Sequence, residues 1–436
     1  MKKYIFFVVG VMCTLLSHTV YAIDLNKSDA NIIGHVLEKK TGEHLPYMTV
    51  ALKGTTIGTM TDGTGHYFLK NLPEGEFILS VSAVGYKPQE RKVTLKRGKT
   101  LEENFELEED MVALDGVVVT ANRNETARRL APTLVKVVTP KLFDMTNSHT
   151  LSQGLVFQSG VRVENDCQNC GYSQVRINGM DGKYTQILID SRPIFSALAG
   201  VYGLEQIPAN MIERVEVVRG GGSALFGSSA IAGTVNIITK EPLRNSGSFA
   251  HSISNFDGSG SFDNNTTLNL SLVSSDNKMG AYIYGQNRHR SAWDSNGDGF
   301  SELPKLKNQT VGVNAYYRLS PYSKLNLEYH HMEEFRRGGN RFDLPPHIAE
   351  DANLNGSGKP GLVEQIEHSI NTGGLKFSAF SKDQKHSFNA YASAQHIVRD
   401  SYYSAYGHTT DFTGVLGAQY IYHFDKLFFM PSDLTG

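Results

Sequence analysis

The sequence predicts a mainly β protein in three parts: a small β-sandwich, a compact α+β domain and a series of antiparallel strands that suit a membrane. Short β-prone runs separated by glycine-containing turns fill residues 31–107. Residues 134–240 mix helical and strand patterns, and from Ser246 onward segments of about ten residues alternate in polarity. A chain of 436 residues also exceeds a single domain of roughly 100–200 residues.

Composition and hydropathy restrict the class of protein. The chain has 42 basic and 44 acidic residues, a formal net charge of −2, and no cluster of either sign that would mark a nucleic-acid or anionic membrane surface. Beyond the first segment, no apolar run is long enough for a spanning helix. We therefore expect either a soluble protein or a membrane β-barrel.

The first 22 residues predict a secretory signal peptide. Two lysines precede an apolar run over residues 4–16, and cleavage is expected after Ala22. The run is shorter than the ~20 residues that a spanning helix needs, so removal is favoured over a membrane anchor. The mature chain is then exported, with Cys167 and Cys170 as its cysteines.

Residues 30–108 form the first predicted domain. Strands are expected over residues 32–36, 49–52, 67–69 and 77–81. His35 and Glu38 could suggest a zinc peptidase, but strand alternation puts them on opposite faces, whereas metal ligands must converge. Residues 61–68 and 72–75 resemble the carboxypeptidase-regulatory-like domain, which implies a transthyretin-like sandwich.

A β-prone run over residues 114–121 follows the acidic stretch 102–110. Such a run can add as an extra strand to the edge of a partner's sheet, or it can be an ordinary linker strand. Its three consecutive valines carry too little information to separate these interpretations.

The second predicted domain, residues 130–241, is α+β. We expect a short helix over residues 148–156, a helix or turn over 223–231, and strands over 186–189, 214–219 and 234–239. Residues 174–179, 188–190, 207–217 and 223–240 resemble, in order, the plug of TonB-dependent outer-membrane receptors. Ser191, Gly221 and Ala232 depart from the pattern of that family, which puts the local turn geometry in question.

The third region, residues 246–436, alternates apolar and polar residues, as at 267–272, 311–317, 325–329 and 388–392. A soluble β-sandwich could produce one such segment, but persistence to Tyr422 favours membrane strands with a lipid face and a lumen face. The family resemblance implies a 22-stranded antiparallel outer-membrane β-barrel, which needs at least ~220 residues before loops. We therefore expect only its N-terminal part here, with the sequence stopping mid-barrel.

The resemblance gives the valine run a coupling role, because the family's TonB box precedes the plug. The box would consist of Asp115, Gly116, Val117, Val118, Val119 and Thr120. An inner-membrane motor complex would act through TonB, which would grip this segment by β-augmentation.

The resemblance also places seven charged plug residues inside the barrel. They are Arg176, Asp190, Arg192, Glu213, Arg214, Glu216 and Arg219. Buried charges must be paired or hydrated. They could form ordinary ion pairs within the plug or a reversible lock between the plug and the barrel wall.

Two plug loops are candidates for cargo binding. The first contains Cys167, Gln168, Asn169 and Cys170, whose C-x-x-C pair could be a disulfide, a soft-metal ligand pair or a redox site. Export favours the disulfide, with metal or thiol-mediated cargo binding second. The other candidate loop contains Phe195 and Tyr202.

A further loop resembles part of a calcium site. Its candidate ligands are Asp294, Asn296, Asp298, the Phe300 carbonyl and Glu302. Lys305 occupies the position of the final glutamate, which excludes a complete EF-hand. The loop could bind a structural Ca²⁺ with help from another loop, or it could be a simple polar turn.

Together, the family resemblance implies a non-enzymatic outer-membrane receptor that needs no cofactor, with the sandwich and the TonB box in the periplasm. It would import a scarce nutrient, such as an iron chelate, haem, cobalamin or another metal complex, with the plug as gate. Its partners would be TonB, the inner-membrane motor, the nutrient and outer-membrane lipid, but not nucleic acid. The alternatives are a glycan or peptide importer that works with a surface lipoprotein, and a surface adhesin or structural β-protein.

Overall fold

The structure is a computed structural model. It describes residues 28–46, 48–62, 64–83, 86–109, 118–119, 126–127, 135–167, 172–193, 207–222, 226–227, 229–351, 361–383, 385–427 and 430–435. The expected signal peptide, residues 1–22, lies outside these ranges. The mainly β fold class is confirmed, because strands predominate among the residues that the structure describes.

The N-terminal sandwich consists of two four-stranded sheets. One contains β1 (Asn31–Glu38), β4 (His66–Leu69), β7 (Thr100–Glu102) and β8 (Phe105–Leu107); the other contains β2 (Thr49–Leu52), β3 (Gly58–Met60), β5 (Gly75–Ser82) and β6 (Gln89–Leu95). Alternate residues point inward, so that Ile32, Val36, Leu79 and Val81 are fully buried between the sheets. Period-two alternation therefore builds the core of this domain.

The α+β domain is built on a five-stranded sheet flanked by short helices and a hairpin. The sheet has the order β11 (Val135–Val138), β16 (Ile212–Arg219), β17 (Gly233–Thr239), β14 (Thr185–Ile189) and β15 (Arg192–Pro193). The flanking elements are α2 (Pro140–Met145), α3 (Leu151–Leu155), β12 (Val161–Cys167), β13 (Tyr172–Ile177) and the 3-10 turns η3 (Gly182–Tyr184) and η4 (Ala209–Met211). Its centre is apolar, with Ile177, Val215, Val217 and Val235 among the buried residues.

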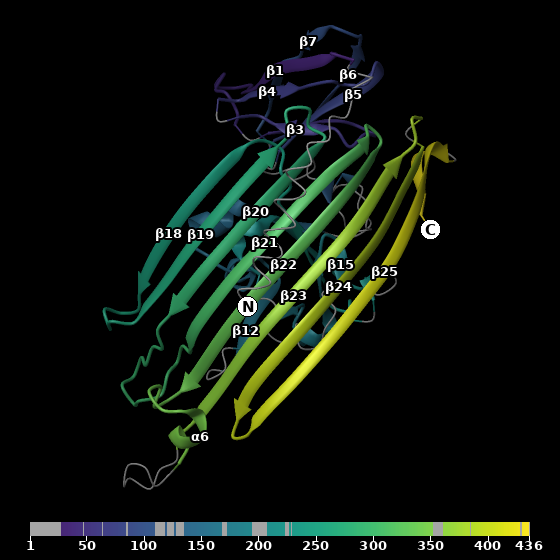
Figure 1. The fold of residues 1–436 in the computed structure, drawn as a ribbon. Helices are drawn as coiled ribbons and strands as arrows, with labels where there is room; N and C mark the ends of the chain where they lie inside the picture. The colour runs from purple at the N-terminus through teal and green to yellow at the C-terminus, as the bar shows by residue number, and fades with distance from the viewer. Residues whose placement is uncertain are drawn as a thin grey trace, which may run out of the picture.

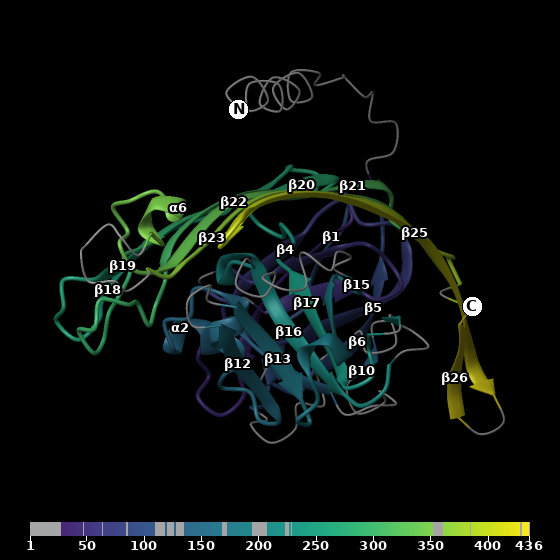
Figure 2. The ribbon, with the colours of Figure 1, turned by 90° about the horizontal axis from the view of Figure 1, so that it is seen from below.

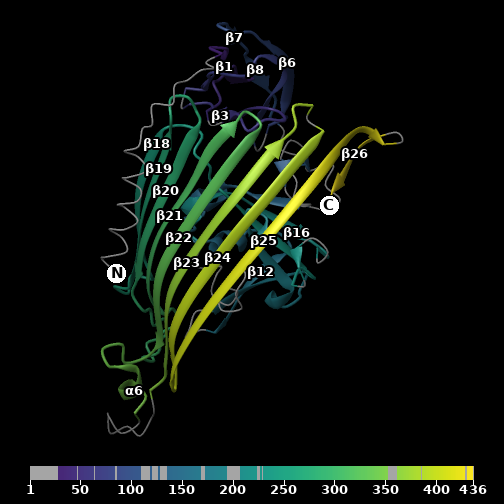
Figure 3. The same ribbon diagram turned by 45° about the vertical axis from the view of Figure 1, so that its right-hand side comes forward.

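The large sheet contains nine antiparallel strands, each paired with its neighbours in sequence. They are β18 (Ser246–Asn255), β19 (Phe262–Val273), β20 (Met279–Arg290), β21 (Lys305–Ser320), β22 (Ser323–Gly339), β23 (Val363–Phe380), β24 (His386–Tyr403), β25 (Tyr406–Leu427) and β26 (Met430–Thr435). The strands run side by side with a common tilt (Figures 1 and 3). From below, the sheet curves around the α+β domain (Figure 2).

Most of these strands are longer than the ten-residue segments that the alternation predicted. β21 has 16 residues and β25 has 22. A tilted strand crosses the apolar part of a bilayer in about 9–11 residues, so the additional length extends the sheet beyond that thickness. The alternating pattern in the sequence therefore predicts the middle of each strand but not the residues that extend it at either end.

The outer face of the large sheet is an apolar ladder in strict register. One row runs across the strands through Leu272, Ala281, Ala315, Leu327, Leu375, Ala392 and Leu416. Its leucines are exposed, with Leu416 84% accessible. A continuous exposed apolar row is costly in water and suits contact with lipid chains. No helix among the described residues has the length and apolar character to cross a membrane.

The sandwich rests on one end of the large sheet, at the turn between β21 and β22 (Figure 1). The Thr56 amide donates to the Pro321 carbonyl at 2.9 Å, and the Thr59 hydroxyl donates to the Leu243 carbonyl at 3.4 Å. Tyr322 packs against the sandwich core. Residues 291–304 lie at the opposite end of the strands, as do the described parts of the connection between β22 and β23, residues 340–351 and 361–362.

Candidate functional site at the interface between the α+β domain and the large sheet

The row next to the outer ladder faces the α+β domain. It contains Ser271, Tyr282, Asn314, Glu328, Gly374, Ser393 and Val415 in register. Three of its side chains bond to the α+β domain: Tyr282 to Asn210, Asn314 to Lys240, and Glu328 to Arg192. The outer face of the sheet is thus exposed, and its inner face binds the α+β domain.

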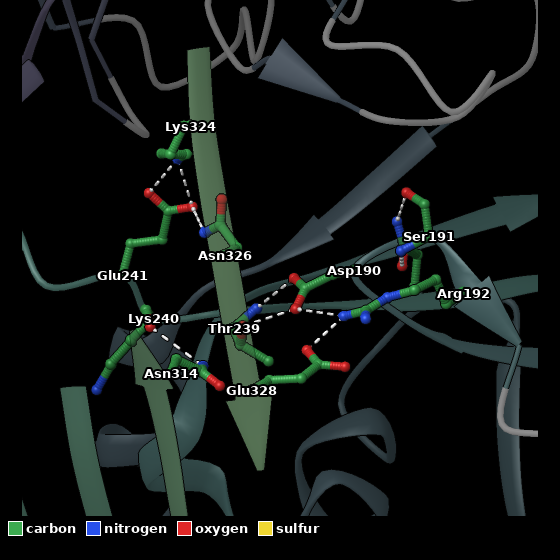
Figure 4. Close-up of polar contacts among 11 residues, drawn as sticks. Asp190, Ser191, Arg192, Thr239, Lys240, Glu241, Asn314, Lys324, Asn326 and Glu328 are labelled. Carbon is green, nitrogen blue, oxygen red and sulfur yellow. Dashed lines mark hydrogen bonds and ion pairs between the residues drawn. The ribbon is translucent and has the colours of Figure 1, made fainter. Parts of the chain in front are cut away.

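The turn from β14 to β15 presents the charged part of this interface. Asp190 and Ser191 both have positive φ, at 47° and 65°. Glycine favours this backbone region, so Ser191 needs compensation there. Its amide donates to the Asn236 side-chain oxygen at 2.9 Å, and the Asn236 amide donates to the Ser191 hydroxyl at 3.2 Å (Figure 4). The departure at Ser191 is therefore accommodated by Asn236.

Asp190 holds this turn against β17. One carboxylate oxygen accepts from the Thr239 amide at 3.0 Å, and the other accepts from the Thr239 hydroxyl at 2.8 Å. The same carboxylate lies 3.7 Å from the Arg192 guanidinium. Because these bonds fix the turn, Arg192 is oriented toward the large sheet (Figure 4).

Arg192 and Glu328 form a short, buried ion pair between the two units. Their side chains are 8% and 22% exposed. Burial alone would lower the pKa of the Arg192 guanidinium, but the carboxylates of Glu328 and Asp190 raise it above its ordinary value. Arg192 is therefore charged at any physiological pH, and it depends on these carboxylates for its counter-charge.

Gly374 on β23 makes room for this ion pair. It lies directly opposite Glu328 in the sheet register. A Cβ atom at Gly374 would lie 2.4 Å from the Glu328 carboxylate and 2.6 Å from the Arg192 guanidinium. A side chain at this position would displace one partner or both.

A second polar cluster lies where the α+β domain joins the large sheet. Glu241 accepts from the Lys324 ammonium at 3.1 Å through each of its oxygens, and from the Asn326 amide at 3.4 Å (Figure 4). The Asn314 amide donates to the Lys240 carbonyl at 3.4 Å. Burial lowers the pKa of Lys240, and Glu213 and Asp144 oppose this shift.

An uncharged seam completes the interface. The Tyr282 hydroxyl donates to the Asn210 carbonyl at 2.9 Å, and the Asn210 side-chain amide donates to Asn269 at 2.9 Å. Tyr282 and Tyr284 also belong to the apolar core of the α+β domain. His149 lies beside this seam, and burial, followed by the charge of Arg288, lowers its pKa.

The seven charged residues singled out in the sequence occupy two settings. Asp190 and Arg192 lie at the interface, and Glu213 lies near Lys240 beside it. Arg176 pairs with Glu164 and, at 3.0 Å, with Asp181, while Arg214 pairs with the fully buried Glu216 at 2.9 Å, all within the α+β domain. Arg219 lies close to Gly160, where a Cβ atom would be 2.4 Å from its guanidinium.

Sequence reasoning did not single out the partners of these residues in the large sheet. These partners are Glu328, Lys324 and Gly374, which lie in a region where the sequence pattern marks mainly the apolar, outward-facing residues. Alternation at residues 325–329 did place Glu328 on the polar face of its strand, which was the available signal. An acidic residue on such a polar row must be either hydrated or paired.

Most residues of the predicted coupling segment and cargo loops lie outside the described part of the chain. Val118 and Val119 form β9 (Val118–Val119), which pairs antiparallel with β10 (Thr126–Ala127). Cys167 ends β12, opposite Tyr172 in the backbone register. The residues outside the description are Asp115, Gly116, Val117, Thr120, Gln168, Asn169, Cys170, Phe195 and Tyr202. Their roles stay predictions.

The predicted calcium loop connects β20 and β21, and it brings three carboxylates together. Oxygens of Asp294, Asp298 and Glu302 lie within 4.8 Å of one another. Asp294 accepts from the Gly297 and Gly299 amides, each at 2.7 Å, and Asn296 donates to Asp298 at 3.2 Å. The turn thus gathers negative charge, as a cation site requires.

Comparison with known families agrees with this architecture. Residues 32–119 match the family model of the CarboxypepD_reg-like domain, and residues 127–234 match that of the TonB-dependent Receptor Plug Domain. These two matches cover the sandwich and most of the α+β domain. The first match ends with β9, and the second begins at the last residue of β10.

Curated relatives include vitamin B12 transporters named BtuB. That of Vibrio vulnificus strain YJ016 is 35% identical over 229 residues, which are 46% of this chain and 37% of the relative. That of Photobacterium profundum is 36% identical over 128 residues, which are 29% of this chain and 20% of the relative. The chain thus spans well under half the length of the curated relatives it matches. These relatives are transporters, not enzymes.

Solved structures share the fold at low sequence identity. The siderophore receptor PirA from Acinetobacter baumannii aligns with a TM-score of 0.57 and 19% identity, over 70% of this chain and 48% of that one. The ferric citrate transporter FecA aligns with a TM-score of 0.54 and 16% identity, over 69% and 46%. With its sandwich, its enclosed α+β domain and its curved antiparallel sheet, this chain shares the fold of these receptors and carries a CarboxypepD_reg-like domain ahead of a TonB-dependent receptor plug domain.

Proposed function

We propose that this protein imports a scarce nutrient across the outer membrane, with the plug as the gate and TonB as the source of mechanical work. The observation that carries this proposal is the two-faced sheet. Its outer row is exposed and apolar, whereas the adjacent row binds the plug through Tyr282, Asn314 and Glu328. A plug held inside a membrane-facing wall can control passage.

The interface can release the plug because it relies on a few polar contacts. If water enters, Arg192 and Glu328 exchange their mutual contact for hydration, so separating them then costs less than breaking the pair in a dry site. The Glu241–Lys324 contact is more exposed, with Glu241 45% accessible. We infer that pulling on the plug opens a hydrated path by breaking these contacts, while the apolar core of the plug stays folded.

The orientation follows from the connections between strands. Outer-membrane barrels have short periplasmic turns and longer external loops. The sandwich rests on the short turn at Pro321, and residues 291–304, 340–351 and 361–362 lie at the other end. In the proposed arrangement the signal peptide is cleaved near Ala22, and the sandwich (30–108) and the TonB box (114–121) are periplasmic. The plug (130–241) then sits within the wall formed by residues 246–436.

Coupling would occur through the backbone of residues 115–120. TonB would add a strand to this segment and displace the short pairing between β9 and β10. Because main-chain hydrogen bonds would give the affinity, the side chains of this segment need no specific functional groups. The inner-membrane motor complex would supply the force.

The cargo class we propose is a metal complex, namely an iron chelate, haem or cobalamin. The support is the matched relatives, whose names specify vitamin B12, a siderophore and ferric citrate. In this proposal the loops with Cys167 to Cys170, and with Phe195 and Tyr202, contact the cargo. A disulfide between the two cysteines would hold the first loop.

The test is uptake by cells that express variants with changes in the box. We expect deletion of residues 115–120 to stop uptake of the cargo that supports growth, while surface binding of that cargo persists. Val118→Pro removes one backbone donor and should have the same effect, whereas Val118→Ala keeps the donor and should transport normally. Unchanged uptake in the deletion variant would overturn the coupling proposal. Uptake of a glycan or peptide that depends on a surface lipoprotein would overturn the proposed cargo class.

We further propose that the loop over residues 294–302 binds a structural Ca²⁺ on the outer side. The convergence of Asp294, Asp298 and Glu302 supports this. Ca²⁺ should raise the unfolding temperature of the wild-type protein but not that of Asp298→Asn. Asp276→Asn, which changes a single carboxylate in the turn at the other end of the sheet, should respond like wild type. A wild-type unfolding temperature insensitive to Ca²⁺ and to chelator would contradict the site.

A further inference from the structure

Three histidines gather on the outer surface of the N-terminal sandwich. His35 lies on β1, His66 lies directly opposite it on β4, and His44 pairs with Leu37 just beyond the end of β4. The inward residues of β1, such as Ile32 and Val36, are buried, so His35 projects from the other face. Three separate segments thus bring one imidazole each to the same patch.

The ring centroids are spaced as in a metal centre, although the ring nitrogens do not converge in this arrangement. The ring centroids are 5.2 Å apart for His35 and His44, 5.7 Å for His35 and His66, and 4.9 Å for His44 and His66. In a tetrahedral site with zinc–nitrogen bonds of about 2.0–2.1 Å, each centroid lies about 3.2 Å from the ion, which separates the centroids by about 5.2 Å. The three observed distances bracket this value.

A hydrogen-bond chain sets the tautomer of His66. The Thr64 hydroxyl donates to the Asp62 carboxylate at 2.7 Å, and its oxygen lies 3.1 Å from Nδ1 of His66. Since the hydroxyl has a single hydrogen and gives it to Asp62, its oxygen accepts from Nδ1–H. Nε2 of His66 therefore carries the lone pair. A carboxylate-supported Nδ1–H behind a free Nε2 is the arrangement found behind metal-bound histidines.

The backbone around the cluster is fixed, while one ring is free to turn. A Cβ atom at Gly65 would lie 2.8 Å from Cβ of His44, so the two loops are in close contact. His44 and His66 are exposed, and their rings are stacked at 30°. Binding of an ion requires His44 to leave this stack and turn its nitrogen toward the other two, which its exposure permits.

We propose that His35, His44 and His66 form a binding site for a transition-metal ion of the zinc, copper and nickel class. Imidazole ligands select these ions over calcium and magnesium. Three protein ligands leave a fourth position open to water or to a ligand. The bound ion would join β1, β4 and the segment before β2, and would stabilise the sandwich by its binding free energy. This site goes beyond the proposed transport function and does not depend on it.

The test is titration of the purified full chain with Zn²⁺ alone, followed by calorimetry and by the unfolding temperature. We expect one equivalent to bind at the cluster, with a higher unfolding temperature and no competition from Ca²⁺ or Mg²⁺. The variant His44→Ala/His66→Ala should lose this equivalent. Both positions are exposed, so circular dichroism should show an unchanged fold.

Two further variants separate a built site from general affinity of surface histidines for metals. Thr64→Val breaks the chain to Asp62 and should weaken Zn²⁺ binding about tenfold, within the range for partners that orient a ligand. His408→Ala removes an exposed histidine that pairs with Asp400 on the large sheet, and should bind like wild type. Zn²⁺ binding that is absent in the wild type, or unchanged in the double variant, would overturn the proposal.

Discussion

Two arginines of the plug form ion pairs in contrasting settings. Arg214 and Glu216 are two residues apart on one strand, so their pair lies within the plug. Arg192 and Glu328 are 136 residues apart and join the plug to the large sheet. In the proposed transport cycle, the first pair can persist when the plug moves, whereas the second must break. The difference separates the pair that stabilises the plug fold from the pair that would hold the proposed gate closed.

The largest effect is expected from Glu216→Ala. Glu216 is fully buried, and its removal leaves the Arg214 charge without this partner, which costs about 3–5 kcal/mol when a buried pair is broken from one side. Calorimetry of the purified protein should show a clearly lower unfolding temperature. Lys183→Ala, at a position 68% exposed in the same domain, is the control and should change little. A stable Glu216→Ala protein would mean that the plug does not rely on this pair.

A smaller effect is expected at the interface. Glu328→Gln keeps the shape but removes the charge that faces Arg192, and the loss of a charged hydrogen bond costs about 1.5–3 kcal/mol. A double-mutant cycle with Arg192→Met isolates the coupling between the two side chains. We expect the double variant to be more stable than the sum of the single changes predicts. Strict additivity would show that the two charges do not interact.

Gly374→Ala tests the same pair without changing either partner. The new Cβ atom would lie 2.4 Å from Glu328 and 2.6 Å from Arg192, and overpacking of this kind costs about 1–3 kcal/mol. Gly373→Ala is the matched control, because its Cβ atom would meet nothing closer than 3.8 Å. Unfolding temperatures should fall for Gly374→Ala alone. Equal values for the two variants would show that the ion pair has room to shift.

The smallest effect is expected at two exposed ion pairs on the sandwich that share Glu108, which serve as a reference for the buried pairs. Lys39 and Lys87 lie 2.6 and 3.1 Å from the Glu108 carboxylate and lower its pKa to about 2. A lowered pKa stabilises the fold above the ordinary pKa of the carboxylate, and this contribution is lost as the pH falls toward 2. Glu108→Gln should remove that part of the acid sensitivity. A matching stability loss in high salt would confirm its electrostatic origin, since solvent screens exposed pairs.

The sequence allowed prediction of features that depend on local pattern. Alternation identified the strands around residues 267–272 and 311–317, because burial of one face imposes a period of two. The β-prone runs at residues 214–219 and 234–239 correspond to β16 and β17, which are buried on both faces. Spacing alone also brought Asp294 and Asp298 into one loop, since a turn gathers residues close in sequence. These inferences needed no knowledge of distant contacts.

Contacts between distant segments could not be predicted in the same way. Arg192 was named as a charge in need of a partner, but Glu328 becomes its partner only through the register of the large sheet and its curvature around the plug. The histidine cluster likewise depends on His66 lying opposite His35 and on His44 pairing beside Leu37. Pairings of this kind are set by the packing of whole domains rather than by local propensity.

The most direct test of this account is hydrogen exchange of the plug in Glu328→Gln and in Glu216→Ala, each compared with wild type. Peptides covering residues 185–193 report the turn that binds the sheet, and peptides covering residues 212–219 report the strand that holds the plug together. We predict that Glu328→Gln speeds exchange in the first segment and leaves the second unchanged, while Glu216→Ala speeds exchange in the second. Equal acceleration of both segments in Glu328→Gln would contradict a gate that opens without unfolding the plug.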